Sequence, residues 1–453
     1  MALSGIQIYK LLPGGERPPH PKANCKECGY PTCLAFAMKL AAKQAELASC
    51  PYVSEESKTE LSAAAAPPIR LVKVSSDGHE LAAGNETVMF RHEKTFFNRP
   101  GLFARVKDAE GAEAIKAIVG PADAYSVNYV GMDLTLDGFA VEAVSGDRAA
   151  FAGAVRTVRE VSKRPLILMS SDPAMMEAGL EAAQGSTPLI YKATEENWEA
   201  MAALAKSYKA PLVVCADSLD ELADLTQKIQ AAGVEDMMLD PCAGDMKTAL
   251  ATLTQLRRLA LKKTFRPLGY PIITFPGQWS DDLVVAAMQA IAKYAGFVVL
   301  DGFTPASAYA LLVFRQNIYT DPQKPIQVTP GLYEINKPGP DDPVMVTTNF
   351  SITYFSVSNE VEGSGSTGWL LVADAEGMSV LTAWAAGKFD AERIAKDIKR
   401  FGVEDKVTRH RVVLPGHVAV LSGELEEELP NWEIKVGPRE AVDLPAYIKE
   451  VLL

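Results

Sequence analysis

The sequence predicts a three-part α/β protein with a short N-terminal domain, a central barrel of strand–helix units and a smaller, doubly wound C-terminal sheet. A chain of 453 residues is too long for one compact core. From residue 69 onward, short apolar runs alternate with helical stretches, which is typical of repeated βα units. Two breaks interrupt this pattern, SAAAAPP at 62–68 and a six-proline stretch at 320–343. We therefore expect domains at 1–60, 69–322 and 344–453, joined by linkers at 61–68 and 323–343.

Composition and charge exclude several classes of function. Hydrophobic residues make up 48% of the chain and charged residues 23%, so large cores can be buried. The net charge of −12 argues against a nucleic-acid partner, because phosphates are bound by clustered Lys and Arg. No apolar run approaches the roughly 20 residues that span a bilayer, and the N-terminus does not resemble a signal peptide. We expect a cytoplasmic protein.

The N-terminal domain is predicted from a cysteine cluster at 24–51, NCKECGYPTCLAFAMKLAAKQAELASCP. Three of its thiols fall in one loop, where Gly29 permits a tight turn. The Ala- and Leu-rich stretch 34–49 predicts a helix that carries the fourth thiol back to that loop. In a reducing compartment, clustered thiols are metal ligands rather than disulfides. The spacing C-x2-C-x4-C-x16-C therefore predicts a four-thiolate site at Cys25, Cys28, Cys33 and Cys50.

An iron-sulfur cluster suits this spacing better than the alternatives do. Structural zinc sites with four cysteines usually pair two C-x2-C knuckles, and this segment has one. A two-iron cluster is open, but the plant-type spacing has its gaps in the reverse order, so a four-iron cluster is favoured. Cys215 and Cys242 lie in apolar, strand-like runs, and we interpret them as core residues.

The central domain is predicted as a (β/α)8 barrel because eight short apolar runs alternate with helical stretches. Those runs lie at 101–109, 138–145, 165–171, 188–193, 211–218, 236–242, 271–277 and 297–303. Chemistry in such barrels sits at the carboxyl ends of the strands. The groups there form no familiar catalytic set, and a strand-end Asp commonly caps the next helix, so we interpret the barrel as a scaffold. They are Asp172, Lys192, Asp217, Asp240 and Asp301.

The C-terminal domain is predicted as a doubly wound sheet. Strands are expected at 344–357, 368–377, 409–416 and 432–438, and helices at 379–387, 390–402 and 441–453. Ligands of such sheets lie beyond the carboxyl ends of the strands. Three loops, at 346–354, 375–384 and 436–441, cluster neutral hydrogen-bonding groups that suit a large ligand fringed with amides. The alternative is that these are ordinary turns and caps. No G-x-G-x-x-G signals a dinucleotide.

Several segments carry a more specific resemblance. They are the cysteine motif, RHEKTFF, LRRLALKKTFRPLGYPII, RQNIYTDPQ, VTTNFSITYFSV, GMSVLTAWAAGKF and VGPREA. Through them, nearly the whole chain resembles the large (gamma) subunit of the corrinoid iron-sulfur protein, from the acetyl-CoA (Wood-Ljungdahl) pathway of anaerobes. In that family a small cluster domain, a TIM barrel and a C-terminal corrinoid domain follow one another, in agreement with the three parts predicted above.

The resemblance implies a methyl carrier. A bound corrinoid, as Co(I), would accept a methyl group from methyltetrahydrofolate through a separate methyltransferase and pass it to acetyl-CoA synthase. A [4Fe-4S] cluster on the four cysteines would reactivate Co(II), and a small subunit would complete a heterodimer. The family places no protein His on cobalt, and we interpret His410 and His417 as surface residues. The implied corrinoid contacts are Thr348, Tyr354, Met378, Ser379, Val380, Leu381 and Ala441.

Two other functions stay open on the residues alone. One is an iron-sulfur oxidoreductase with an active site in the barrel and a nucleotide or flavin in the last domain. The other is a barrel scaffold with a structural zinc knuckle.

Overall fold

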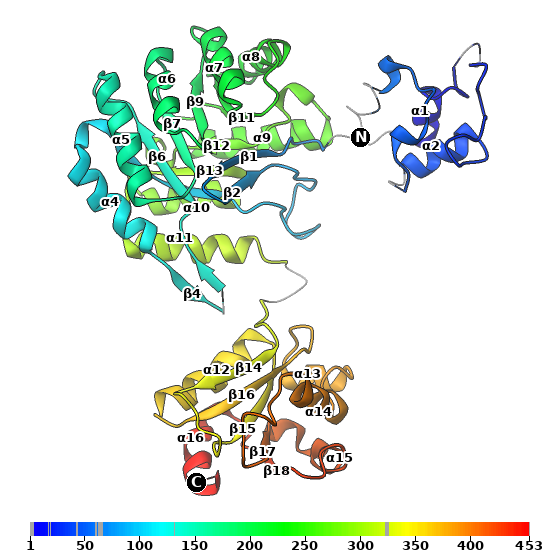
Figure 1. The fold of residues 1–453 in the computed structure, drawn as a ribbon, viewed down its shortest axis with the longest axis vertical. Coiled ribbons are helices and arrows are strands. Elements are labelled where there is room, and N and C mark those ends of the chain that lie inside the picture. The colour runs from blue at the N-terminus through cyan, green and yellow to red at the C-terminus, as the bar shows by residue number, and fades with distance from the viewer. Residues whose placement is uncertain are drawn as a thin grey trace. The chain divides into compact units, whose positions relative to one another are not determined.

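The computed structural model describes residues 4–16, 18, 20–41, 44–58, 61, 67–130, 132–321 and 326–452. The chain divides into two compact units (Figure 1). The first comprises Met1–Tyr125 and Thr135–Tyr319, and the second comprises Ser126–Leu134 and Thr320–Leu453. Most of the expected joint at 61–68, and the start of the expected linker at 323–343, lie outside the described residues.

The N-terminal segment has a small core of its own. Its elements are α1 (Gly5–Lys10), α2 (Cys33–Ala41) and the 3-10 turn η1 (Leu47–Ser49). Apolar side chains from these elements and the loops around them, such as Ile8, Leu12 and Phe36, pack with three of the cysteines. The segment therefore forms its packing around the thiols themselves.

The expected helix over 34–49 is wrong in its length. The observed α2 ends at Ala41, and Cys50 follows the separate turn η1. An unbroken helix from Cys33 to Cys50 would place the two residues about 25 Å apart, at 1.5 Å of rise per residue. The chain has to leave the helix for Cys50 to return toward the loop.

The central part is a closed barrel of eight parallel strands, which confirms the (β/α)8 prediction. The strands are β3 (Gly101–Lys107), β6 (Gly138–Glu142), β7 (Leu166–Met169), β9 (Leu189–Ala193), β10 (Leu212–Cys215), β11 (Met237–Asp240), β12 (Ile272–Thr274) and β13 (Ala295–Leu300). The helices that follow them are α4 (Ala112–Ala124), α5 (Arg148–Val161), α6 (Pro173–Ala182), α7 (Trp198–Tyr208), α8 (Leu219–Ala231), α9 (Met246–Lys262), α10 (Leu283–Ala292) and α11 (Pro305–Ile318).

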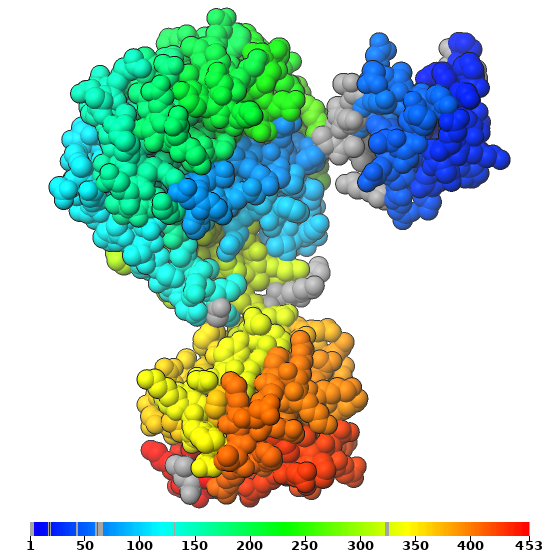
Figure 2. Space-filling view, viewed as in Figure 1, coloured from blue at the N-terminus to red at the C-terminus, as the bar shows by residue number. Residues whose placement is uncertain are grey.

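A hairpin closes the amino-terminal end of this barrel. Its strands β1 (Val72–Ser76) and β2 (His79–Ala83) pair antiparallel, and the short β8 (Ser186–Thr187) pairs with β1. Its apolar side chains belong to the same core as the barrel interior. At Gly101, the first residue of β3, an added Cβ would lie 2.5 Å from Leu81 Cδ2. In Figure 2 the blue surface of this region lies flush between the cyan and green parts of the barrel. The hairpin does not cover the opposite end of the barrel, where the strands end.

The second unit is built on a five-stranded sheet with the order β14-β16-β15-β17-β18. Its strands are β14 (Gly331–Ile335), β15 (Val344–Thr348), β16 (Gly368–Ala373), β17 (Arg411–Leu414) and β18 (Glu433–Val436), and β14 alone among them runs antiparallel to its neighbour. Its helices are α12 (Ser351–Gly363), α13 (Val380–Ala385), α14 (Ala391–Arg400), α15 (Ser422–Glu428) and α16 (Leu444–Tyr447), with shorter turns η5 (Gly416–Leu421), η6 (Ala441–Asp443) and η7 (Ile448–Leu452).

Helices cover both faces of this sheet, as the alternation along β15 requires. Val344 and Val346 face a core shared with α13, α14 and α15. Met345, between them, faces a second core that includes residues of α12, α16 and η7. A short hairpin, β4 (Val127–Tyr129) with β5 (Met132–Leu134), leaves the barrel sequence after α4 and belongs to this second unit.

Two expectations for this unit need correction. The stretch 344–357 was expected to be one strand, but β15 ends at Thr348 and residues from Ser351 form α12. Its buried side chains, Ser358 and Val361, follow helical spacing, so packing overrides the strand preference of the Ile, Thr, Tyr and Phe residues before them. The expected linker also contains β14, an edge strand bracketed by prolines, where a missing N–H is tolerated.

No helix in the described part of the chain is long and apolar enough to cross a membrane.

Candidate functional site

The N-terminal segment holds the four predicted cysteines in one small folded unit. Cys33 and Cys50 are buried, while Cys25 and Cys28 are partly exposed, and all four are free thiols. Burial raises the pKa of Cys50, and the neighbouring thiolates of Cys28, Cys33 and Cys25 raise it further. Thiolates that lie near one another repel, so a bound cation or cationic cluster would relieve the repulsion.

The loop that carries the first three thiols is held by specific contacts. The Asn24 N–H donates to Cys33 Sγ at 3.3 Å, and the Cys33 N–H donates to Asn24 Oδ1 at 2.8 Å. The Tyr52 hydroxyl donates to the Glu27 carboxylate at 2.8 Å, which ties the loop to the residues after Cys50. An N–H···S hydrogen bond of this kind stabilises an electron-rich sulfur. Hydrogen bonds to the sulfurs are also found in iron-sulfur sites. The sequence pattern did not identify Asn24.

The second unit holds a cavity of about 1000 Å³ at the carboxyl end of its sheet. Strand order reverses at β15, which lies between β16 and β17, and such a switch point is where open α/β sheets bind ligands. The segments after all four parallel strands contribute to the wall, along with Tyr129 and Val130 of the β4–β5 hairpin. At Gly416 an added Cβ would lie 2.5 Å from the Gly437 carbonyl oxygen, so the loops after β17 and β18 need a glycine to approach.

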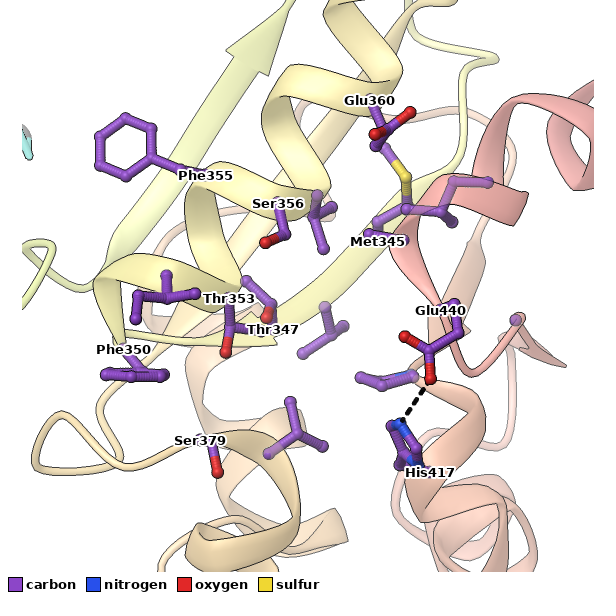
Figure 3. Close-up of a pocket in the computed structure, with 18 of the residues that line it drawn as sticks. Met345, Thr347, Phe350, Thr353, Phe355, Ser356, Glu360, Ser379, His417 and Glu440 are labelled. Atoms are coloured by element: carbon purple, nitrogen blue, oxygen red, sulfur yellow. Dashed lines mark ion pairs between the residues drawn. The ribbon is translucent and has the colours of Figure 1, made fainter.

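Neutral hydroxyls and apolar groups dominate the cavity wall. Figure 3 shows Thr347 and Thr353 between α12 and the loop that bears Ser379. On the opposite side, His417 Nε2 lies 3.9 Å from Glu440 Oε1. The lining favours a large, mostly uncharged ligand that offers hydrogen-bonding groups along its edge.

One polar group on the wall lacks a protein partner. The Thr347 hydroxyl is fully buried and makes no hydrogen bond within the described chain, and the adjacent Thr348 hydroxyl is in the same condition. A buried hydroxyl without a partner is unfavourable, and a ligand that offers a hydrogen bond would remove that penalty. Thr347 therefore makes the cavity a candidate binding site.

The loops around the cavity are fixed by Asn349. Its Oδ1 accepts from the N–H groups of Ala375 and Gly377 at 2.9 and 3.0 Å. Gly377 has a φ of +74°, and an added Cβ there would lie 2.7 Å from Gln327 Cγ. This network sets the turn that leads to Ser379, the N-cap of α13.

The structure separates the seven predicted contacts into two groups. Ser379, Val380, Leu381 and Ala441 line the cavity. Thr348, Tyr354 and Met378 are not among its lining residues. Tyr354 meets Tyr333 edge to face, with ring centroids 5.1 Å apart, and Met378 packs on the core beneath α13 and α14.

Sequence patterns did not identify several other residues of the cavity wall. Thr347 and Phe350 lay in a segment already singled out, but strand and helix periodicity did not show which side chains face the cavity. His417 is exposed, as expected, and it also lines the cavity wall after β17. His410 stacks on Trp432 at 5.0 Å.

At the barrel mouth, the helix-cap interpretation holds only in part. Asp172 caps α6, with its Oδ1 accepting from the Ala174 N–H at 2.8 Å, and Asp217 is exposed. Asp301 instead pairs with Arg105 at 2.6 Å. Asp240 is buried and accepts from the Tyr191 hydroxyl at 2.9 Å.

Cys215 is buried, as the core interpretation requires, and Cys242 is partly exposed, but the expectation that disulfides are improbable is wrong for this pair. They form a disulfide with a Cα–Cα distance of 6.5 Å. The two cysteines lie at or just beyond the carboxyl ends of β10 and β11, which are hydrogen-bonded neighbours. Their separation of 27 residues hides this closeness in the sequence.

Known proteins similar to this chain agree with these features. A family described as CO dehydrogenase/acetyl-CoA synthase delta subunit matches residues 72–448, and one described as "Putative Fe-S cluster" matches residues 21–52. The corrinoid/iron-sulfur protein large subunit of Moorella thermoacetica is 44% identical over 99% of both chains. The acetyl-CoA decarbonylase/synthase complex subunit gamma of Archaeoglobus fulgidus is 35% identical over 99% of this chain and 98% of that one.

Among solved structures, the dihydropteroate synthase of Thermus thermophilus aligns with 55% of this chain and 99% of its own. Its identity is 17% and the TM-score is 0.38, which is too low to bear on function.

Proposed function

Because the chain belongs to the family of corrinoid/iron-sulfur protein large subunits and acetyl-CoA decarbonylase/synthase gamma subunits, we propose that it carries methyl groups on a bound corrinoid. We assign residues 1–60 to a cluster domain, 69–322 to the barrel and 344–453 to corrinoid binding. The stretches 61–68 and 323–343 join them.

The cavity of the second unit fits a corrinoid by its size, its place and its chemistry. A corrinoid is a wide ring fringed by neutral amide side chains, which both donate and accept hydrogen bonds. The buried Thr347 hydroxyl is the single observation that carries this assignment, because it needs a partner from inside the cavity. Ser379, Val380, Leu381 and Ala441 would contact the ring from the same wall. Thr348, Tyr354 and Met378 would act on it from just behind that wall.

When bound, the corrinoid supplies cobalt that, as Co(I), accepts a methyl group from methyltetrahydrofolate through a methyltransferase and yields it to acetyl-CoA synthase. The chain's own residues bind and orient the ring and exclude water from one side of it. His417 faces Glu440 across 3.9 Å, and we propose that it stays there and does not bind cobalt.

Cys25, Cys28, Cys33 and Cys50 would hold a [4Fe-4S] cluster that returns Co(II) to the active state. The fit rests on the mutual repulsion of the thiols at Cys50 and on the N–H···S bond from Asn24. The thiolates and the electron-rich sulfurs of such a site favour a low-potential electron donor.

The partners in this proposal are a small subunit in a heterodimer, a methyltetrahydrofolate methyltransferase and CO dehydrogenase/acetyl-CoA synthase. We place the complex in the cytoplasm. No membrane or nucleic-acid partner is proposed.

Metal analysis with anaerobic EPR tests the whole assignment. The chain would be co-expressed with the small subunit in a host that makes corrinoids. We expect about four iron atoms and one cobalt per heterodimer, with a Co(II) signal that lacks coupling to an axial nitrogen. Iron without cobalt, or flavin released on denaturation, would favour the iron-sulfur oxidoreductase instead. A colourless protein with one zinc would leave a scaffold.

A further inference from the structure

The carboxyl end of the barrel carries a pair of cysteines that neither proposed cofactor uses. Cys215 ends β10, and Cys242 follows β11 by two residues. They are joined in a disulfide. This disulfide lies outside the four-thiol segment and belongs to the first unit, whereas the cavity belongs to the second. The pair therefore calls for a role independent of both.

The two sulfurs have different surroundings. Cys215 is only 4% exposed, whereas Cys242 is partly exposed. Lys192 Nζ lies 3.5 Å from Cys215 Sγ. An ammonium group at this distance stabilises a thiolate on Cys215.

Cys242 is held in place by its neighbour in sequence. Its backbone has a φ of +48°, and its N–H donates to Asp240 Oδ1 at 2.9 Å. The other carboxylate oxygen of Asp240 accepts from Tyr191, and the Lys192 ammonium, whose charge also acts on this acid, contacts Cys215 Sγ. Other ionisable groups act on this site: besides burial, the exposed Asp217 raises the pKa of Asp240, and Glu142 and Arg105 lie near Tyr191.

We propose that Cys215 and Cys242 are a redox-active pair that undergoes thiol–disulfide exchange with a dithiol reductant. A thiolate of the reductant attacks Sγ of the accessible Cys242. The disulfide bond breaks, and its electron pair goes to Cys215, whose thiolate is stabilised by the Lys192 ammonium. The second thiol of the reductant then attacks the mixed disulfide and releases Cys242. The reductant ends as a disulfide, and the protein gains two electrons and two protons.

This assignment gives each residue a distinct task. Cys242 is the attacked sulfur, Cys215 is the leaving group, and Lys192 is a positioning residue that lowers the free energy of the departing thiolate. A leaving group with a lower pKa departs faster, so loss of the cation should slow reduction without removing the disulfide.

The test follows the two cysteines by peptide mass spectrometry in the cofactor-loaded heterodimer under argon. The protein is equilibrated with mixtures of reduced and oxidised dithiothreitol, quenched in acid, and labelled with light and heavy iodoacetamide. Because each cysteine is read from its own peptide, the cluster thiols do not interfere. We expect Cys215 and Cys242 to become reduced together, over one transition. Independent labelling of the two, or labelling of both in fully oxidised dithiothreitol, would overturn the proposal.

Variants of Lys192 test the direction of the exchange. Lys192→Met should slow reduction by dithiothreitol about tenfold, while Lys192→Arg should keep most of the rate. Equal rates in all three proteins would remove Lys192 from the assignment. Should Lys192→Met fail to fold, the wild-type protein still decides the attacked sulfur: brief reduction with a bulky monothiol should trap the adduct on Cys242, and an adduct mainly on Cys215 would contradict the mechanism.

Discussion

The Thr347→Val substitution should have opposite effects on the protein with and without its ligand. Valine has nearly the shape of threonine, so it fills the same space at the end of β15. It removes a hydroxyl that is fully buried and has no partner within the described chain. Without corrinoid, the free energy of unfolding of the second unit should rise by about 1–3 kcal/mol, the usual penalty of such a group.

In the complex with corrinoid, the substitution should be destabilising instead of stabilising. If the hydroxyl binds an amide of the ring, valine removes that bond and gives nothing in return. The loss of about 1 kcal/mol in the complex adds to the stabilisation of the corrinoid-free chain, so binding should weaken by about 2–4 kcal/mol, roughly thirtyfold to a thousandfold. Urea unfolding of the corrinoid-free chain and equilibrium dialysis of the corrinoid would measure the two effects.

Thr348→Val is the matched control, because its hydroxyl is equally buried and unpartnered but does not line the cavity. It should stabilise the corrinoid-free chain by a similar amount, and any loss of affinity should be smaller than that of Thr347→Val. The reasoning fails if Thr347→Val leaves corrinoid affinity unchanged, or if it destabilises the empty protein.

Three further predictions concern the other parts of the chain. Cys50→Ala should impair reductive reactivation of Co(II) far more than methyl transfer from corrinoid already reduced to Co(I), as stopped-flow spectra of each step would show. Arg257→Met should lower the stability of the barrel by about 3–5 kcal/mol in urea unfolding, because it strands the buried Glu86 carboxylate that Arg257 pairs with at 2.9 Å. Burial raises the pKa of Asp240, so its favourable contribution is present below about pH 4 and is lost as the pH rises through the raised value. Asp240→Asn should therefore flatten the fall in barrel stability between acid and neutral pH.

Each of these has an outcome that contradicts it. Equal loss of both activities in folded Cys50→Ala protein would refute the separation of roles. A double variant, Arg257→Met with Glu86→Gln, should cost less than the sum of its single changes, and simple additivity would mean that the pair is not coupled. An unchanged pH profile in Asp240→Asn would show that another group titrates.

The sequence was informative wherever burial alone determines structure. All eight barrel strands are short runs of apolar residues because both of their faces are covered, and each stands out against the helix that follows. The four cysteines were recognisable because their spacing is local. Ser379 was recognisable as the start of a helix because a glycine turn precedes it.

The rest depended on contacts distant in sequence. The residues that open α12, Ser351 to Val357, have the composition of a strand, and only packing against the sheet makes them helical. The disulfide needed the knowledge that β10 and β11 end side by side. Asn24 and Thr347 gained meaning only when their partners, or the lack of one, became visible.

The β4–β5 hairpin gives the second unit an unusual covalent layout. The unit is assembled from two separate pieces of chain, so the polypeptide crosses between units at residues 125–126, 134–135 and 319–320. A fragment that began at Thr320 would lack Tyr129 and Val130 of the cavity wall. A single protease cut near residue 320 would likewise leave the hairpin attached to the barrel. A gene fusion at one boundary would transfer only part of the cavity wall. Such a unit therefore cannot be moved between proteins as a single C-terminal segment.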